Sequence, residues 1–464
     1  MTLHRILSRR SILRGLRGVA ALFVGSLLAS ASISPAIAVP SYARQTGADC
    51  AACHVGSFGP QLTPYGIRFK IGGYTDTDGK DGKIPLSAMA VANWTRTSKD
   101  LPERPPHFSD NNNTAMQEVS AFLAGRLSDH VGTFIQATYS GVERRTALDQ
   151  FDIRYARSVN LADGEAVFGL ALNGNPTLTD PFNTLGQWRF PYTASDFGFG
   201  TGSSPIVENL AGSVVGLNAY ALWDNSIYFE LGLYDSLSRR TTNRLNTSQV
   251  AAGGIEAGKF KGLGSYWGLA YFKDMKRDNF SVGLFGFDAQ VADATSHGGS
   301  DRYRDLGLDA SYQFLGNRAN IFAVNASYVR EWQKLNYTFK VLGSADNHDN
   351  TLDTYRLSAS YHRDQTWGAT LGLFKTRGSA DGGLYSGESY TNRPDIAGHI
   401  LQADWTPWGK ETSWGAPWAN LRLGVQYTGY TRFNGGSHYI DEVNGVNRSA
   451  RDNNTTMLFL WLAI

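Results

Sequence analysis

The stretch Ser226–Tyr234, "SIYFELGLY", decides the fold class, because large apolar side chains occupy every second position in it. These apolar residues share one face of an extended chain: Ile227, Phe229, Leu231 and Leu233. The intervening positions form a second face, which carries the carboxylate of Glu230. A period of two is typical of a β-strand with one apolar and one polar surface. We therefore expect this stretch to be a strand.

Segments with the same alternation follow one another from residue 85 to the C-terminus. They predict sixteen strands, near 87–98, 114–126, 131–141, 149–158, 164–173, 209–222, 226–236, 265–273, 279–290, 304–314, 319–331, 353–362, 367–377, 397–406, 420–431 and 455–464. Short connections such as 315–318 alternate with long ones such as 174–208, as the turns and loops of outer-membrane barrels do. The connection 407–419 is too long for the short turn due there, which suggests a misplaced strand boundary.

We expect the apolar face of these strands to contact lipid. A soluble protein of this length would be expected to divide into domains, whereas the strand series runs to Ile464 without a linker. Aromatic residues make up 12% of the chain and cluster near segment ends, as in the interfacial girdles of membrane barrels. After the N-terminal region, no apolar run is long enough for a helical span. The predicted fold class is all-β, an outer-membrane barrel of about sixteen antiparallel strands over residues 85–464.

Residues 1–38 have the composition of an export signal. Five arginines and no acidic residue precede or border the apolar run 18–33, and "AIA" at Ala36–Ala38 is a typical cleavage motif. The run "SRRSILR" at 8–14 resembles a twin-arginine signal, but we interpret it as a coincidence of the basic region. Without residues 1–38, the chain has 38 basic and 41 acidic residues and a net charge of −3. No basic patch indicates nucleic-acid binding.

Both cysteines of the chain lie in one short motif, "CAACH" at Cys50–His54, within the segment 39–84. In c-type haem attachment, two thiols form thioethers with the cofactor and the adjacent histidine ligates the iron. A structural zinc site would need a second pair of ligands at motif spacing, which the sequence lacks. A redox dithiol would be expected in a βαβ context. We therefore predict one covalently attached haem c, bound by Cys50 and Cys53, with His54 as the iron ligand.

The run from Pro40 to Tyr74, "PSYARQTGADCAACHVGSFGPQLTPYGIRFKIGGY", resembles the N-terminus of the fused cytochrome-porin family of bacterial outer membranes. The residues that carry the resemblance are Ala43 to Gly47, Cys50, Cys53, His54, Leu62, Thr63, Gly66, Phe69, Lys70, Gly73 and Tyr74. The chain departs from the family pattern at Tyr42, where phenylalanine is frequent, and at Ile67, which separates Gly66 from Arg68. The resemblance implies a monohaem segment at 39–84 followed by a porin barrel.

The best-known members of that family are outer-membrane iron oxidases. The implied function is oxidation of extracellular Fe(II), with electrons passed through the haem to a periplasmic cytochrome or cupredoxin, in the manner of an Fe(II):cytochrome c oxidoreductase. We expect the segment 39–84 to fold into the lumen as a plug, since about 45 residues are too few to bury a haem alone. The alternatives are a donor other than iron, or a porin or solute channel in which the haem segment is structural or gating.

The sixth ligand of the iron is left open by the sequence. Met89 and Met116 are the nearest methionines and His107 the nearest histidine, with His130 further along. A methionine would raise the haem potential, as in cytochromes c, whereas gap filling is the usual role of methionine in a packed structure. The remaining alternative is an iron whose sixth coordination position has no protein ligand.

Loop histidines and aspartates form a further group, because nitrogen and oxygen ligands together can hold Fe(II). The residues are His297, His348 and His438, with Asp301, Asp346, Asp349 and Asp441. Exposed loops normally contain polar groups of this kind, so solvated loop polarity is the simpler interpretation. The sequence assigns no catalytic residue.

Overall fold

The structure is a computed structural model that describes residues 40–80, 82–161, 164–200, 202–252, 255–294, 299–410, 412–414, 418–441 and 443–464. The predicted signal peptide, 1–38, lies outside the described residues, and so does His297. All described residues belong to one unit of the chain, Ala36–Ile464. None of the helices among them has the length and apolar character needed to cross a membrane.

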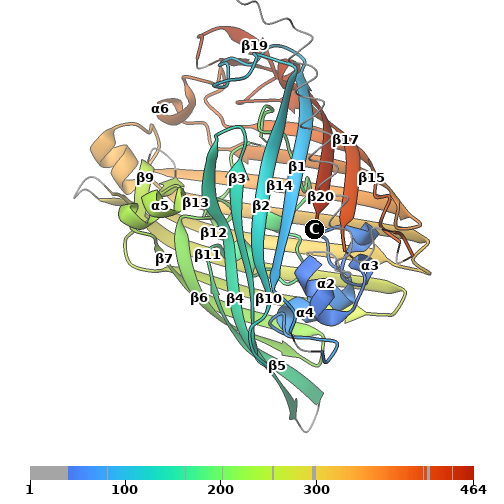
Figure 1. Cartoon of the computed structure of the whole chain (residues 1–464). Coiled ribbons are helices and arrows are strands. Elements are labelled where there is room, and N and C mark those ends of the chain that lie inside the picture. The colour runs from blue at the N-terminus through green and yellow to red at the C-terminus, as the bar shows by residue number, and fades with distance from the viewer. Residues whose placement is uncertain are drawn as a thin grey trace, which may run out of the picture. The chain divides into compact units, whose positions relative to one another are not determined.

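Sixteen antiparallel strands form a closed barrel, in which each strand pairs with the preceding and the following barrel strand (Figure 1). They are β1 (Leu86–Thr97), β2 (Asn113–Arg126), β3 (Val131–Ser140), β4 (Arg145–Leu161), β5 (Gly164–Asn173), β6 (Val214–Trp223), β7 (Ile227–Ser236), β10 (Gly264–Asp274), β11 (Asp278–Asp293), β12 (Ser300–Phe314), β13 (Asn320–Lys334), β14 (Asp349–Arg363), β15 (Trp367–Gly378), β16 (Ile396–Trp405), β17 (Asn420–Arg432) and β20 (Thr455–Ala463). Strand β20 pairs with both β17 and β1, which closes the barrel. The predicted fold class is confirmed, and every predicted strand is present with its ends displaced by a few residues at most.

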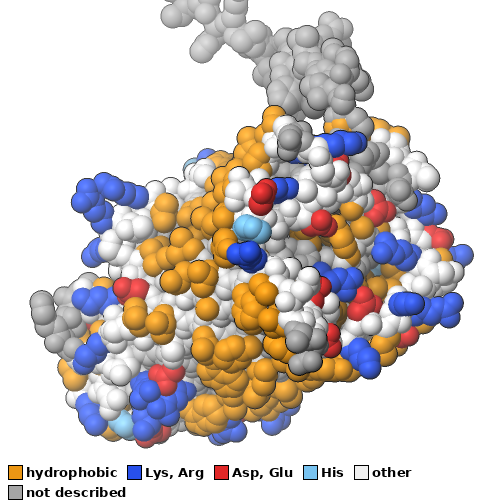
Figure 2. Space-filling view, turned by 90° about the horizontal axis from the view of Figure 1, so that it is seen from below, with side chains coloured by type: hydrophobic (Ala, Val, Ile, Leu, Met, Phe, Trp, Pro, Cys, Tyr) orange, Lys and Arg blue, Asp and Glu red, His pale blue; other side chains and the backbone are white. Residues whose placement is uncertain are grey.

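The alternation in Ser226–Tyr234 places the two faces of β7 on opposite sides of the barrel wall. Leu231 is 52% exposed on the outside, whereas Glu230 is 1% exposed on the inside. Exposed apolar side chains occur on most other strands, and Figure 2 shows them gathered over a broad part of one face. A closed barrel has no sheet edge and satisfies its backbone groups internally, so it can span a bilayer. A closed barrel with an apolar outer band is an outer-membrane protein.

The two ends of the barrel differ in the length of their connections. One end carries short turns such as 127–130 and 315–319, and the other carries long loops such as 174–213 and 433–454. In outer-membrane barrels the short turns face the periplasm. The first strand begins and the last strand ends at the short-turn end, where the N-terminal segment also lies.

The connection between β16 and β17 is a long one at the short-turn end. The expectation of a misplaced boundary near 407–419 was wrong, because β16 ends at Trp405 and β17 begins at Asn420. Within its described part, the rings of Trp408 and Trp414 contact each other with centroids 4.7 Å apart. Doubling the length of a loop costs only about 0.6 kcal/mol in closure entropy, so turn length is a tendency of these barrels and not a constraint.

The long loops contain short elements that the alternation did not predict. Strand β8 (Val250–Ala252) pairs with β9 (Ile255–Phe260), which extends onto β11, and β18 (His438–Ile440) pairs with β19 (Asn447–Ser449). The helical turns in the connections are η2 (Pro176–Leu178), η3 (Gly186–Trp188), η4 (Ile206–Glu208), α5 (Arg239–Leu245), η5 (Thr338–Leu342), α6 (Gly382–Tyr385) and η6 (Ala450–Asn453). Each is too short to show a hydrophobic period.

Two segments occupy the interior of the barrel. The first is residues 40–80, called the haem segment below because the sequence predicts haem attachment in it. It contains α2 (Pro40–Thr46), α3 (Cys50–Cys53), η1 (Val55–Ser57) and α4 (Pro64–Ile71) and is drawn in blue in Figure 1. The second is the lumen loop, whose described residues 174–200 and 202–213 run along the inner wall. Inward side chains hold this loop: Gln426 Nε2 donates to the Thr193 carbonyl at 3.0 Å, and Gln117 Nε2 to the Ala194 carbonyl at 2.7 Å.

Candidate functional site

The CxxCH motif lies on the single helical turn α3. The Asp49 carboxylate caps this turn by accepting a hydrogen bond from the Ala52 N–H at 2.8 Å, as N-cap residues do. The His54 N–H donates to the Cys50 carbonyl at 2.9 Å and ends the turn. Cys50 and Cys53 are the first and last residues of this turn, and His54 follows directly.

The His54 ring is closely enclosed by its own segment. A Cβ added to Gly59 would lie 3.3 Å from the ring Cε1, so glycine at this position lets the backbone approach the imidazole. The Nδ1 atom is buried without a hydrogen bond of normal geometry to any described residue. Burial lowers the pKa of His54 to about 4. The imidazole is therefore neutral at physiological pH, which is the form that ligates a metal.

A cavity of about 280 Å³ lies between the haem segment and the inner wall of the barrel. Cys53, His54 and Met89 contribute to its lining, whereas Cys50 is buried outside that lining. Most of the other lining side chains are apolar or aromatic, among them Phe58, Leu62, Phe69, Tyr74, Phe122, Phe134, Trp188 and Trp461. Apolar cavities with a few placed polar groups are typical of cofactor sites.

The alternatives to a haem fit this site less well. Burial raises the pKa of the Cys53 thiol to about 12, and the neighbouring Cys50 adds to the shift, whereas catalytic dithiols have lowered pKa values. In the part of the chain that the structure describes, no three His, Cys, Asp or Glu side chains gather closely enough to hold a metal ion. A neutral imidazole with a buried Nδ1, the nearby Cys53 thiol and a mainly apolar cavity suit a haem c.

The candidates for the sixth ligand lie in different places on the barrel. Met116 is 50% exposed on the outer face of β2. His107 is exposed in the long loop between β1 and β2, and His130 is exposed in the turn 127–130. Met89 occupies an inward position on β1 and lines the cavity. Of these four residues, the fold brings only Met89 to the cavity that His54 lines.

The haem segment is hydrogen-bonded to the wall on opposite sides of the lumen. The Ser57 hydroxyl donates to the Gln365 carbonyl in the turn between β14 and β15 at 2.6 Å, and Asn420 Nδ2 donates to the Ser57 carbonyl at 2.6 Å. Across the lumen, the Tyr220 hydroxyl on β6 donates to the Ile71 carbonyl at 2.8 Å. Contacts on both sides hold the segment across the short-turn end.

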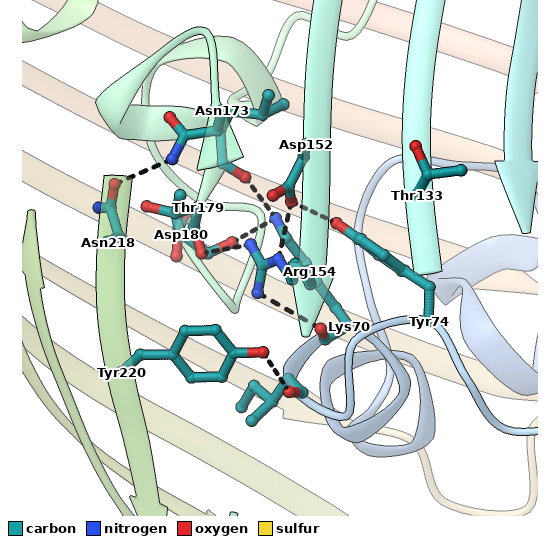
Figure 3. Close-up of polar contacts among 12 residues, drawn as sticks. Lys70, Tyr74, Thr133, Asp152, Arg154, Asn173, Thr179, Asp180, Asn218 and Tyr220 are labelled. Carbon is teal, nitrogen blue, oxygen red and sulfur yellow. Dashed lines mark hydrogen bonds and ion pairs between the residues drawn. The ribbon is translucent and has the colours of Figure 1, made fainter. Parts of the chain in front are cut away.

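A buried ion pair on β4 joins the wall to both interior segments (Figure 3). Arg154 Nε lies 2.8 Å from Asp152 Oδ2, and both side chains are fully buried. The Tyr74 hydroxyl donates to the same carboxylate at 2.7 Å. The Arg154 guanidinium also donates to the Lys70 carbonyl at 3.3 Å and to the Thr179 carbonyl at 3.2 Å. One arginine therefore connects the wall, the haem segment and the lumen loop.

Lys70 provides a second link between the haem segment and the lumen loop. Its Nζ donates to the Leu178 and Asp180 carbonyls at 2.8 and 2.6 Å, and to Asn183 Oδ1 at 2.7 Å. The same ammonium lies 4.9 Å from the ring centroid of Trp188, within the range of cation–π attraction. The two interior segments are thus fastened to each other as well as to the wall.

The loop histidines and aspartates occupy separate places. His297 lies outside the described residues, and His438 is exposed on β18. Asp301 is fully buried and caps the start of η5, while Asp441 pairs with an arginine of its own loop at 3.5 Å. His348 Nδ1 lies 2.7 Å from the carboxylate of its sequence neighbour, Asp349. These contacts stabilise individual loops, in agreement with the simpler interpretation.

Two inward residues near the motif were missed by the sequence analysis. Trp461 on β20 contacts Phe58 of the haem segment, with ring centroids 4.9 Å apart. His362 on β14 is 6% exposed and packs against the backbone of Gly56. The alternation along each strand assigns both side chains to the inner face, but it does not indicate which interior segment they meet.

No family model and no curated protein matches the sequence. Among solved structures, the chain is similar to Salmonella typhi OmpF in complex with daunomycin, at a TM-score of 0.47 and 12% identity over 82% of this chain and 98% of that chain. The outer-membrane channel DcaP of Acinetobacter baumannii has a TM-score of 0.44 and 11% identity over 82% of this chain and 97% of that chain. The anion-selective porin from Comamonas acidovorans has a TM-score of 0.40 and 10% identity over 82% of this chain and 98% of that chain. At this level of similarity, the assignment rests on the strand pairing and outer surface of the chain itself. By these features the chain is an outer-membrane β-barrel of porin-like, sixteen-stranded architecture.

Proposed function

We propose that this barrel is a c-type cytochrome-porin that oxidises extracellular Fe(II) and passes electrons to a periplasmic cytochrome or cupredoxin. The observation that carries the proposal is the apolar cavity inside the barrel, with Cys53 and His54 in its lining. A diffusion pore has no need of a CxxCH motif beside a mainly apolar cavity. The choice of Fe(II) as donor rests on the family resemblance of the segment Pro40–Tyr74.

In this proposal, Cys50 and Cys53 attach the haem and His54 ligates its iron. The cofactor supplies one-electron redox chemistry when it is bound. Aromatic side chains such as Phe122 and Phe134 line the cavity that would hold it, and an apolar shell of this kind influences the redox potential. The neutral imidazole of His54 is ready to bind the metal without first losing a proton.

The position of the cavity supports transfer of electrons across the outer membrane. The haem segment lies across the short-turn end, which faces the periplasm in outer-membrane barrels, and a soluble carrier could approach it there. The donor would reach the protein from the long-loop end. Because the haem segment and the lumen loop occupy the interior, the barrel would serve as an insulating sheath around the electron path.

A solute channel gated by the haem segment is the second candidate, and the porin-like architecture of the barrel favours it. Opening such a channel would require the haem segment to leave the lumen. That movement would break two hydrogen bonds between buried residues: the one from Arg154 to the Lys70 carbonyl and the one from the Tyr74 hydroxyl to the Asp152 carboxylate. The two candidates therefore differ in whether the interior segments move.

The test combines spectroscopy with flux measurements. Detergent-purified protein is mixed with Fe(II) in a stopped-flow spectrometer from acidic to neutral pH, beside a Cys50→Ala/Cys53→Ala variant and a Met116→Leu control altered on the lipid face. We expect covalent haem, and rapid appearance of reduced c-type bands, in the wild type and the control alone. The same proteins in liposomes should show little solute flux.

Three outcomes would contradict parts of this proposal. A haem that dithionite reduces but Fe(II) does not would exclude iron as the donor. Solute flux through the wild type in liposomes would favour the channel. The absence of covalent haem from protein produced with a haem-attachment system would exclude the cytochrome function altogether.

A further inference from the structure

We infer that the Met89 thioether is the sixth ligand of the haem iron. This inference deepens the proposed function and rests on haem attachment at Cys50, Cys53 and His54. Met89 faces inward from β1 and lines the cavity together with Cys53 and His54. A methionine thioether opposite a histidine is an established ligand pair for c-type haem iron.

The Met89 side chain is held in place by its neighbours. The Trp461 indole Nε1–H donates to Met89 Sδ at 3.3 Å, across the pairing of β20 with β1. Met89 also packs against the aromatic cluster that contains Phe69 and Phe122. A free methionine has three rotatable bonds, so these contacts reduce the conformational entropy lost when the sulfur binds a metal.

The position of Met89 is coupled to the haem motif through two aromatic rings. Phe58 follows His54 by four residues and meets Trp461 edge to face, at 4.9 Å between centroids and 67° between planes. The Arg422 guanidinium lies 5.7 Å from the Phe58 centroid on the side of the barrel wall. Phe58 of the haem segment thus contacts Trp461, and Trp461 hydrogen-bonds the sulfur of Met89.

The other methionines in the described ranges are placed elsewhere. Met116 and Met275 are 50% and 44% exposed, on the outer face of β2 and in the turn after β10. Met457 is 1% exposed, accepts a hydrogen bond from Asn93 Nδ2 at 3.7 Å, and is not among the residues that line the cavity. Met89 is thus the one described methionine in contact with the space beside His54.

His362 is the strongest competitor for the ligand position. It faces inward on β14 and is 6% exposed. Its ring lies against the backbone of Gly56, where an added Cβ would come within 2.4 Å of the ring Nδ1. The imidazole therefore packs behind the turn that follows His54 and does not line the cavity. It supplies a discriminating variant for the experiment.

The experiment uses the purified holoprotein and reads the coordination of the iron directly. The ferric wild type should be low-spin and show the near-infrared charge-transfer band of methionine-ligated haem. Met89→Leu, of similar volume, should lose that band, become high-spin, bind added imidazole and have a lower reduction potential. Met116→Leu and Met457→Leu should leave the spectrum and the potential unchanged.

Further variants separate loss of ligation from misfolding. Met89→His should restore a low-spin iron at a lower potential than the wild type, which a misfolded barrel would not do. Trp461→Phe keeps a ring against Phe58 and removes the N–H, and it should increase the high-spin fraction. Retention of the methionine band in Met89→Leu would overturn the inference. Loss of the low-spin spectrum in His362→Gln, with Met89→Leu unchanged, would assign the ligand to His362.

The failure of this inference is distinguishable from failure of the proposed function. A wild type that carries covalent haem without a methionine band overturns the role of Met89 and leaves haem attachment intact. A wild type without covalent haem overturns both. A methionine-ligated haem that Fe(II) fails to reduce supports the role of Met89 and excludes only the iron donor.

Discussion

Replacement of Arg154 by methionine is expected to loosen the haem segment from the barrel. In the native chain its guanidinium is fully buried beside the Asp152 carboxylate, at 2.8 Å. The variant leaves that carboxylate buried with the Tyr74 hydroxyl as a remaining donor. It also removes the guanidinium donor from the Lys70 and Thr179 carbonyls.

The magnitude follows from the complete burial of the pair. Removal of one partner from a buried ion pair costs about 3–5 kcal/mol in the free energy of unfolding. This value already contains the desolvated carboxylate, so the two carbonyl hydrogen bonds are not added to it. Since about 1.4 kcal/mol corresponds to a tenfold change in an equilibrium constant, states without the docked segment should become roughly 100- to 4,000-fold more populated.

Two further variants isolate the cause. Asp152→Asn in the Arg154→Met background removes the unpaired charge, so the double variant should recover part of the lost stability. Arg157→Met changes an exposed arginine three residues along the same strand, and it should alter stability by no more than about 0.5 kcal/mol.

The assay is denaturant unfolding in lipid vesicles, followed by tryptophan fluorescence, together with limited proteolysis of the haem segment. Arg154→Met should lower the unfolding midpoint and expose the segment to protease. A loss below about 1 kcal/mol, the mean for unselected substitutions, would refute the reasoning. A double variant as unstable as the single one would also refute it, because the unpaired carboxylate would then not be the source of the loss.

Three further predictions concern the lipid face, the haem turn and pH. Leu231→Arg should destabilise the barrel by about 2–4 kcal/mol if the side chain is near the bilayer midplane, and Leu231→Ala should destabilise it by less. Urea titration in vesicles measures both losses, and equal losses would contradict a lipid-facing position. Gly56 and Gly79 both have positive φ, 70° and 79°, but a Cβ would clash with His362 only at Gly56. Gly56→Ala should therefore lower the unfolding midpoint more than Gly79→Ala does. In a haem-free Cys50→Ala/Cys53→Ala chain, the pKa of His54 in the folded state, about 4, lies below its ordinary value of 6.5. The contribution of His54 to stability is therefore complete above pH 6.5 and is lost as the pH falls towards 4. Unfolding measured as a function of pH should show this loss, and a further His54→Gln substitution should remove the part of the pH dependence that comes from His54.

Much of the barrel was predictable because its determinants are local. The alternation around Leu231 and Glu230 recurs in each strand, and it fixes which side chains face lipid. The loop elements β8, β9, β18 and β19 were not predictable, because segments of three to six residues carry too little pattern. The long connection 407–419 was misjudged because every turn at this end of the barrel was assumed to be short, whereas β16 ends at Trp405 and β17 begins only at Asn420.

The candidate site divides in the same way. Cys50, Cys53 and His54 are adjacent in the sequence, so the motif could be recognised without a fold, and haem attachment itself stays a prediction. The surroundings of the motif come from distant residues: Trp461 lies more than 400 positions away in the sequence, and only strand pairing brings it beside Met89. Whether the loop histidines and aspartates lie close together could not be judged before the loops were placed.

Local pattern was enough to predict the strand class, the strand number and the lipid-facing surface, and to locate the CxxCH motif, because each of these depends on residues that are close together along the chain. The folded chain was needed to show where the haem segment lies, which methionine shares its cavity, and how Arg154 and Lys70 fasten the interior segments. Closure of a barrel brings together side chains from strands that are far apart in sequence, and the filling of its lumen depends on their combined shapes and hydrogen bonds. No local pattern encodes that combination.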